Sequence, residues 1–422
     1  MVAIPLALRF GHFTPIIAYC SLFISSSILY LFICWDSFKL DKSERGLIPL
    51  LVFLLILRLA FLTMQPMGSD DVYRYMWDGR VQAAGINPYR YAPNDSTLTY
   101  LQTTRLPSQV NHADLKTVYF PLSEWTFYLA YALSGEHPWG FQLFILVAEI
   151  FTFIGLVKLT RQLSHSPWWV LFYAANPLII LQFSLDCHVD ALGFPFLLFG
   201  LLFYFRKNLI QSLLLIGMSL LIKPTALVLL PILFFDQKGL ANKAKVAAIP
   251  IAIMLVPFIP YSLGVNPFEA LAFFSKHWFF NGALFSLLLP MFPDNETNRL
   301  VCLGILTAFL LALYLGKKSF NIKIVLSMLL LLLCSPVAHP WYMGWTIVLL
   351  PLAPLVSGIA LAATASLPSI TFVSYQLNGI WKDYPLVLVL EYVPVVALLL
   401  FVDLRMKRDG RWNRRDESLT KE

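Results

Sequence analysis

The chain has 422 residues, of which 58% are hydrophobic and only 13% are charged, with a formal net charge of +7. Soluble globular domains carry about 25% charged residues, so this composition excludes an ordinary soluble domain. The basic residues lie between apolar runs and in the stretch Arg405–Glu417, which fits the charge pattern of membrane proteins and argues against a nucleic-acid partner.

Apolar runs recur along nearly the whole chain and are suited to cross a bilayer as helices. We expect an all-α polytopic membrane protein with about thirteen transmembrane helices. The first run follows no basic segment or small-residue cleavage site, so we expect it to be retained as a span. The expected spans are 14–34, 46–64, 138–158, 168–185, 190–205, 209–222, 224–235, 246–262, 300–316, 324–339, 341–357, 359–376 and 386–404.

Short basic segments between the spans set the expected orientation, because such segments favour the cytoplasmic side. They are 37–46, Lys158 with Arg161, Arg206 with Lys207, 236–245 and 316–323. With an odd number of spans they all fall on one side, together with a basic cytoplasmic tail at 405–422. We therefore expect the N-terminus outside and a single transmembrane domain over residues 1–404.

This topology brings the remaining polar segments to the outer face. They are the long loop 65–137, the turn 184–191, the loop 265–282 and the turn 335–345, and they contain most of the chemically capable side chains. Such a concentration of functional groups at one rim favours an enzyme that acts on lipid-linked material at that surface. A structural scaffold would need no such concentration.

The loop 65–137 begins with a stretch that predicts a short amphipathic helix at the membrane surface. Ser69 is a suitable N-cap, Asp70 and Asp71 occupy the first turn, and Gly85 suits a left-handed end. One interpretation is that the two aspartates only cap this helix and pair with Arg74. The other is that a water-accessible carboxylate beside a second charge serves as a general base.

The segment "SDDVYRYMWDGRVQAAGINPYRYAP" resembles the first outer loop of the C-type glycosyltransferases, integral-membrane enzymes that use polyprenyl-phosphate sugars, and in particular of bacterial polyprenyl-phosphate mannosyltransferases. Further similar pieces follow in order at 188–204, 220–231, 276–288 and 335–345, so the resemblance covers about 45–345. In the superfamily the acidic loop usually follows the first span. Here it follows the second, which predicts an added N-terminal helix.

The resemblance implies the C-type glycosyltransferase fold and an inverting transfer of a sugar, with mannose expected, from a polyprenyl-phosphate donor to a glycolipid or polysaccharide acceptor. It implies a bacterial inner-membrane location with the active site facing outward. In the family, the aspartate of an Asp-x-Tyr motif is the expected base. This aspartate corresponds to Asp71, with Asp70 as second choice. Tyr73, Arg74 and Asp78 would then contact substrate.

Charged groups at other outer positions are candidates for a metal or for the donor phosphate. Asp186, His188 and Asp190 could bind Mg²⁺ or Mn²⁺, although helix capping explains the same residues. Lys223 and Arg58 lie within or beside apolar runs, where an ionisable group is costly, so both could bind the phosphate. Snorkelling to lipid headgroups is the alternative for both.

Aromatic and histidine residues complete the expected site. His339 could contact the phosphate, while Trp341 and Tyr342 could stack on the sugar or the prenyl chain. An interfacial aromatic belt would explain the tryptophan and the tyrosine without the histidine. His277 is a weaker candidate of the same kind, and Glu149 should find a hydrogen-bond partner within a span.

Other classes of membrane protein remain open at this stage. A secondary transporter would place its charged groups near the bilayer midplane within repeated halves, and no inverted repeat is evident. A flippase for lipid-linked sugars would also need a cationic group for the phosphate. A polysaccharide polymerase or ligase would also combine many spans with an outer loop.

Overall fold

The computed structural model describes residues 15–39 and 45–405, whose regular secondary structure is helical and which contain no β-sheet. Within these residues, strand-like pairing is confined to two isolated bridges, which join Phe280 and Asn281 to Val337. The predicted tail at 405–422 lies outside the described residues except for Arg405. The α-helices are α2 (Pro15–Ser37), α3 (Leu47–Leu59), α4 (Asp71–Ala83), α5 (Pro121–Ser134), α6 (Trp139–Gln162), α7 (Leu171–Ala174), α8 (Phe194–Phe205), α9 (Leu209–Leu220), α10 (Leu230–Asp236), α11 (Leu240–Leu255), α12 (Glu269–His277), α13 (Ala283–Leu288), α14 (Asn295–Leu315), α15 (Phe320–Cys334), α16 (Gly344–Ile347), α17 (Val356–Thr364), α18 (Ile370–Asn378) and α19 (Pro385–Leu398).

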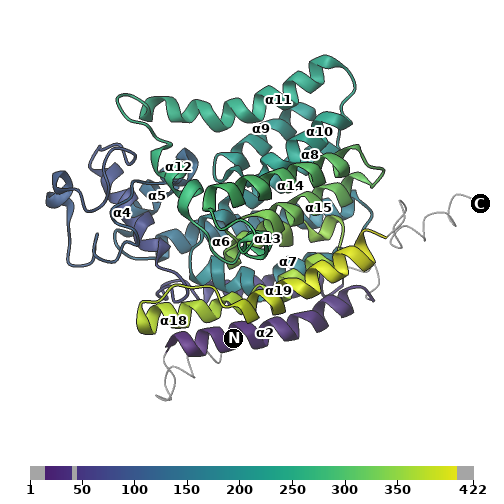
Figure 1. The fold of residues 1–422 in the computed structure, drawn as a ribbon, viewed down its shortest axis with the longest axis horizontal. Helices are drawn as coiled ribbons and strands as arrows, with labels where there is room; N and C mark the ends of the chain where they lie inside the picture. Colours follow the sequence, from purple (N-terminus) through teal and green to yellow (C-terminus); the bar gives the residue numbers. More distant parts are fainter. Residues whose placement is uncertain (1–14, 40–44, 406–422) are drawn as a thin grey trace, which may run out of the picture.

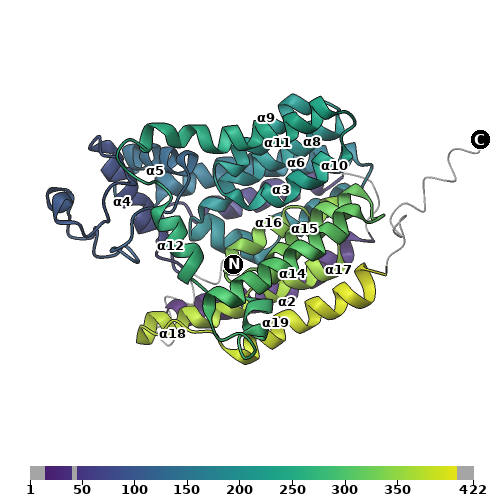
Figure 2. The same cartoon turned by 45° about the horizontal axis from the view of Figure 1, so that its top comes forward.

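The long helices lie side by side, and the outer loop gathers at one end of the bundle. Figure 1 shows α8, α9, α11, α14 and α15 running alongside one another, with α2 and α19 along a further side. Both views place α4, α5 and α12 at one end, while the end of α19 lies at the opposite end (Figures 1 and 2). The helices that follow the second expected span and the end of α19 therefore lie at opposite ends of the bundle.

Membrane-spanning character is clear, but the expected count of about thirteen spans is not confirmed. Among the described residues, six helices are long and apolar enough to cross a membrane, or up to seven if the bent pair Pro167–Ala174 and Ile179–Leu185 is one span. Apolar helices of 10–17 residues cover most of the other expected spans, such as Leu47–Leu59 and Phe320–Cys334. The expected span 341–357 is a series of short helical pieces, because Pro351 and Pro354 interrupt it.

The outer surfaces of the long helices are apolar. Leu29 and Phe32 on α2 are 63% and 65% exposed, and many leucine, valine and phenylalanine side chains on other helices are similarly open. Exposed apolar surface on this scale is unfavourable in water and is expected where lipid is the solvent. The described part of the chain is therefore a helical membrane protein.

A buried ion pair joins the spanning helix α6 to the shorter apolar helix α3 and to a broken helix. Arg58 on α3 bonds with Glu149 on α6 at 2.9 Å, and its other nitrogens donate to the carbonyls of Leu54 and Ala174. Glu149 also accepts a hydrogen bond from Tyr173 on α7. Both charged side chains are fully buried, so their mutual pairing is required to offset desolvation.

The outer region has its own apolar core, built where α4 crosses α5. A Cβ at Gly79 would lie 2.4 Å from the carbonyl oxygen of Phe127, so only glycine permits this close approach. Val72, Tyr75 and Trp77 are nearly inaccessible and pack into this core. The helix expected at the membrane surface is thus packed inside the outer region, because its apolar face is covered by protein.

Candidate active site

The two aspartates at the start of α4 do not act as its caps. The helix begins at Asp71, Asp70 occupies the N-cap position, and its side chain makes no capping bond. Ser69 Oγ instead accepts from the Asp71 backbone N–H at 3.2 Å. The carboxylates are free for other partners, so the interpretation of this pair as helix capping alone is wrong.

The Asp71 carboxylate lies between an amide and an imidazole. Asn111 Nδ2 donates to Asp71 Oδ1 at 2.8 Å, and His188 Nδ1 lies 3.4 Å from Asp71 Oδ2. The His188 side chain is 1% exposed, whereas that of Asp71 is 19% exposed. Asp71 is therefore the member of the pair that an incoming molecule can reach.

The neighbouring carboxyls differ in acidity. Burial and the charge of Asp71 raise the pKa of Asp70 above its usual value. Burial would also raise the pKa of Asp71, but His188, by hydrogen bonding and charge, and the Asn111 amide bring it below the usual value. Asp71 consequently stays ionised at a pH where Asp70 still holds a proton, so it is the member of the pair that carries negative charge over the wider pH range.

The turn that contains Asp186, His188 and Asp190 separates these side chains instead of converging them. Asp186 accepts from the Tyr19 hydroxyl at 2.6 Å, from Gln182 Nε2 at 3.2 Å and from the backbone N–H groups of Met67 and Gly68, each at 2.9 Å. Its oxygens are saturated by donors, so it anchors the start of the outer loop. Within 15–39 and 45–405, no three His, Cys, Asp or Glu side chains converge as metal ligands. The structure does not bring the predicted Mg²⁺ or Mn²⁺ site together.

Gly68 makes the anchoring contact possible. A Cβ at this position would lie 2.6 Å from Asp186 Oδ2 and 2.6 Å from the Tyr19 hydroxyl oxygen. The first helix of the described chain, α2, therefore contacts the polypeptide just ahead of Asp71 through Tyr19. The extra N-terminal helix expected from the sequence thus has a place in the architecture of the site.

A stack of four rings lines the same end of the molecule. His188 stacks on Trp341 with ring centroids 3.7 Å apart, Trp341 on His339 at 4.3 Å, and His339 on Phe280 at 4.9 Å. Nε2 of His188 and Nδ1 of His339 are buried without a hydrogen-bond partner, while Nδ1 of His188 faces Asp71. Buried polar atoms are rarely left unpaired in a folded protein, so these nitrogens mark a place where a ligand is expected.

Lys223 completes the group from the break between α9 and the segment Pro224–Asp236. Its ammonium donates to Asp190 Oδ1 at 2.7 Å and lies 3.4 Å from the ring centroid of Tyr342. Trp345 Nε1 donates to the same Asp190 oxygen. Burial lowers the pKa of Lys223, while the charges of Asp190 and Asp71 oppose that shift. The cation is held close to Asp71 and is partly accessible, with 24% of its side chain exposed.

Several predicted substrate-contacting residues lie elsewhere. Arg58 is sealed against Glu149, which supplies the partner that the sequence left unnamed, and so it does not reach a phosphate at the rim. Arg74 donates to the carbonyls of His112 and Leu115, away from the carboxylates. His277 is exposed and stacks on Phe273. The prediction for Arg58 is therefore wrong, since neither snorkelling nor substrate binding describes its contacts.

Tyr73 and Asp78 are also used within the outer region. The Tyr73 ring lies beneath the Arg105 guanidinium at 5.6 Å. Asp78 is buried, with Arg74 Nη1 4.0 Å from its Oδ1, and burial raises its pKa to about 6. Glu124 on α5 is buried beside it and bonds with Thr117 at 2.6 Å. The polar side of α4 therefore stabilises the loop that follows the helix.

Three further segments reach the site without having been expected there. Asn111 comes from the middle of the 65–137 loop, where no sequence pattern distinguishes it. Tyr375 on α18 places its hydroxyl 3.5 Å from Asp70 Oδ2, and Trp381 packs against Phe280 and His339. The alternation of spans puts residues 377–385 on the outer face, which was a usable signal for Trp381.

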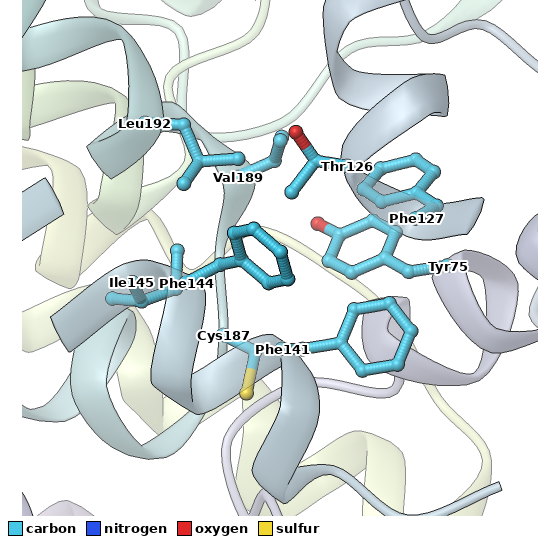
Figure 3. Close-up of a pocket in the computed structure, with 9 residues that line it drawn as sticks. All are labelled: Tyr75, Thr126, Phe127, Phe141, Phe144, Ile145, Cys187, Val189 and Leu192. Carbon is cyan, nitrogen blue, oxygen red and sulfur yellow. The ribbon is translucent and has the colours of Figure 1, made fainter. Parts of the chain in front are cut away.

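An apolar pocket opens behind the 186–190 turn. Figure 3 shows its lining of Tyr75, Thr126, Phe127, Phe141, Phe144, Ile145, Cys187, Val189 and Leu192. Cys187 and Val189 line this pocket, while His188 between them faces Asp71. The turn therefore separates a polar site from an apolar one.

This arrangement can deprotonate a hydroxyl beside a cation. Asp71 supplies an ionised, accessible carboxylate, Lys223 supplies positive charge, and the buried imidazoles supply unsatisfied hydrogen-bonding groups. Base, cation and exclusion of water are what a transfer between an anionic leaving group and an alcohol requires.

Comparison with known proteins agrees with this chemistry. Residues 6–236 match a family described as alpha-(1->6)-mannopyranosyltransferase, N-terminal domain, a range that contains Asp71, His188 and Lys223. Alpha-(1->6)-mannopyranosyltransferase A of Corynebacterium glutamicum is 25% identical over 203 residues, which is 45% of this chain. The match spans 39% of that relative's length. No solved structure matches the chain.

Proposed function

The chain belongs to the alpha-(1->6)-mannopyranosyltransferase family, and on that premise we propose that it transfers mannose from a polyprenyl-phosphate donor to a hydroxyl of a glycolipid or polysaccharide acceptor. The transfer takes place at the outer face of a bacterial inner membrane. In this proposal the chain crosses the membrane about thirteen times, with its N-terminus outside and the 65–137 loop over the donor.

Asp71 is the general base of the proposed reaction. The acceptor oxygen attacks the anomeric carbon while its proton passes to the Asp71 carboxylate, and the bond from that carbon to the phosphate oxygen breaks. Polyprenyl phosphate leaves with the bonding electron pair. Attack from the opposite face inverts the anomeric centre, so an α-linked product requires a β-linked donor.

The cation and the aromatic residues bind the donor. Lys223 retains N–H groups beyond the one that bonds with Asp190, and these stabilise the negative charge that develops on the phosphate. His339 donates to the same phosphate, and the edges of Trp341 and Tyr342 bound the sugar.

One observation carries the proposal: Asp71 is the accessible half of a carboxylate–imidazole pair whose histidine is otherwise unpartnered. A flippase needs a cation that binds the phosphate. It does not need an ionised carboxylate that accepts a proton. The access of Asp71 to an incoming hydroxyl, together with its contact with His188, therefore supports transfer over translocation.

The test is a transfer assay on purified protein in lipid nanodiscs with radiolabelled polyprenyl-phosphate mannose and a panel of mannoside acceptors. Asp71→Asn should lower the rate by at least about 10². Asp95→Asn is the matched control: Asp95 lies in the same loop and accepts from Thr97 N–H, which asparagine does equally well.

The outcomes separate the candidate functions. Transfer that survives Asp71→Asn would overturn the assignment of the base. Movement of the labelled lipid across liposome membranes without transfer would favour a flippase, and processive addition of many residues would favour a polymerase.

A further inference from the structure

One side chain contacts both aspartates at the start of α4. Asn111 Nδ2 lies 2.9 Å from Asp70 Oδ1 and 2.8 Å from Asp71 Oδ1. A primary amide has two N–H groups, so it can donate one hydrogen bond to each carboxylate. Asn111 is thus the only described side chain that hydrogen bonds to both members of the pair.

The backbone around Asn111 is held in place by the same helix that carries the aspartates. Arg74, one turn after Asp71, donates from Nη2 to the carbonyl of His112 at 3.1 Å and to that of Leu115 at 2.7 Å. His112 has a φ of 46°, a left-handed conformation that is costly for a residue with a Cβ. Strain of this kind persists where surrounding contacts impose it, and it is common at functional sites.

The bridge determines which oxygen of Asp71 faces His188. Asn111 occupies Oδ1, and the opposite oxygen, Oδ2, faces His188. Without the amide, the adjacent carboxylates would repel each other and Asp71 could turn about its χ angles. A base in the wrong rotamer is ineffective even when it is ionised, because proton transfer depends on its placement.

We propose that Asn111 is a positioning residue for sugar transfer: its amide ties Asp70 to Asp71 and holds Asp71 with Oδ2 toward His188 and the acceptor, while Arg74 fixes the loop that delivers it. This inference rests on the proposed function, since it assigns Asn111 a role in the same reaction. Arg74 acts through the His112 and Leu115 carbonyls.

Other ionisable groups also influence the acidity of Asp70 and Asp71, and these groups are the same in the wild type and in the Asn111 variants. Those that influence the Asp71 carboxyl are Asp70, Tyr75, His112, Tyr119, His188, Lys223, His339 and Tyr342, and Tyr375 faces Asp70. None is altered by a substitution at residue 111, so a change in the acidity of the pair can be assigned to the amide.

The test measures kcat/KM against pH for Asn111→Ala and Asn111→Asp. Loss of the amide donor should lower the maximal kcat/KM about 10-fold. It should also move the low-pH fall of the kcat/KM profile (its acidic limb) to higher pH by about one unit. Asn111→Asp has nearly the same shape but adds a third carboxylate, so its limb should move further in the same direction. Gln109→Ala, an exposed neighbour in the same loop, should behave as wild type.

A second readout does not depend on activity. A carbodiimide labels carboxyl groups in their protonated form, and mass spectrometry of the peptide that contains residues 70 and 71 follows labelling against pH. Its midpoint should rise in both variants. A rate loss with unchanged limb and labelling midpoints would show a purely structural role and overturn the proposal, as would a wild-type profile in Asn111→Asp.

The two proposals fail separately. A wild-type protein that transfers no mannose contradicts the proposed function, and the labelling midpoints still decide whether Asn111 controls the pair. A wild-type protein that transfers mannose, with Asn111 variants that match it in both readouts, contradicts only the role of Asn111.

Discussion

Two buried charge pairs in this protein have opposite surroundings. In the middle of the bundle, Arg58 and Glu149 are fully buried, and their polar atoms are shared among each other, Tyr173 and backbone carbonyls. At the outer end, Asp71 is partly open, and its partner His188 has no other hydrogen bond. A pair whose hydrogen-bonding atoms all have protein partners stabilises the fold, whereas a pair with an unpartnered atom is available for chemistry. The number of partners, more than burial, distinguishes the two.

Breaking the inner pair should have the largest effect on stability. Arg58→Met keeps much of the side-chain volume and leaves Glu149 charged and unpaired, which should cost about 3–5 kcal/mol. Thermal unfolding in detergent, followed by loss of the monodisperse peak in size-exclusion chromatography, measures this. The double variant Arg58→Met with Glu149→Leu should recover most of the loss, and a single variant as stable as wild type would contradict the structural role.

Breaking the outer pair should lower activity and leave stability nearly unchanged. His188→Phe keeps a ring on Trp341 and removes the imidazole that faces Asp71, and the Nε2 of that imidazole contributes no hydrogen bond to the fold. Transfer should fall about 10–100-fold, because Asp71 loses the group that opposes the effect of burial on its pKa. The acidic limb of the rate profile should therefore move upward. Equal losses of stability in His188→Phe and Arg58→Met would erase the distinction.

Disturbing the contact of Gly68 with Asp186 and Tyr19 is expected to have an intermediate effect on the rate of transfer. In Gly68→Ala the added Cβ would push against Asp186 and Tyr19, displacing the start of the loop that leads to Asp71. A small misplacement of a catalytic group is expected to lower the rate about 10-fold or more. Gly304→Ala, where a Cβ meets open space, is the control for glycine replacement. Wild-type rates in Gly68→Ala would show that this contact does not position the site.

The smallest effect is expected from Asp70, and it sharpens the choice between the two carboxylates. The pKa of Asp71 is lowered from 3.8, so activity should be present above that value and lost only as the pH falls through the depressed pKa. The pKa of Asp70 is raised, so a limb above 3.8 would identify Asp70 as the base. We expect Asp70→Asn to change the rate less than about threefold and to leave the limb in place. The pH dependence of kcat/KM in both proteins measures this.

Sequence patterns located the site better than they assigned its parts. The alternation of apolar runs and basic segments brought Asp71, His188, Lys223 and His339 to one face, and the structure brings these side chains together. The same reasoning failed for Arg58 and Asp186, because a charged residue near the rim looks the same in sequence whether its partner is substrate or protein. Only the identity of the neighbours distinguishes them.

The sequence by itself determined that this chain is an apolar helical membrane protein and that its ionisable groups gather at one end, since both follow from local composition and its order along the chain. The tertiary structure decided which charges are saturated: Glu149 against Arg58, Asp186 against Tyr19 and the loop backbone, and Asp190 against Lys223. It also decided that Asn111 reaches the aspartates across 40 residues of chain. Such pairings depend on how segments that are distant in the sequence pack together. A hydrogen bond requires its donor and acceptor to lie about 3 Å apart, and the local sequence does not determine that distance.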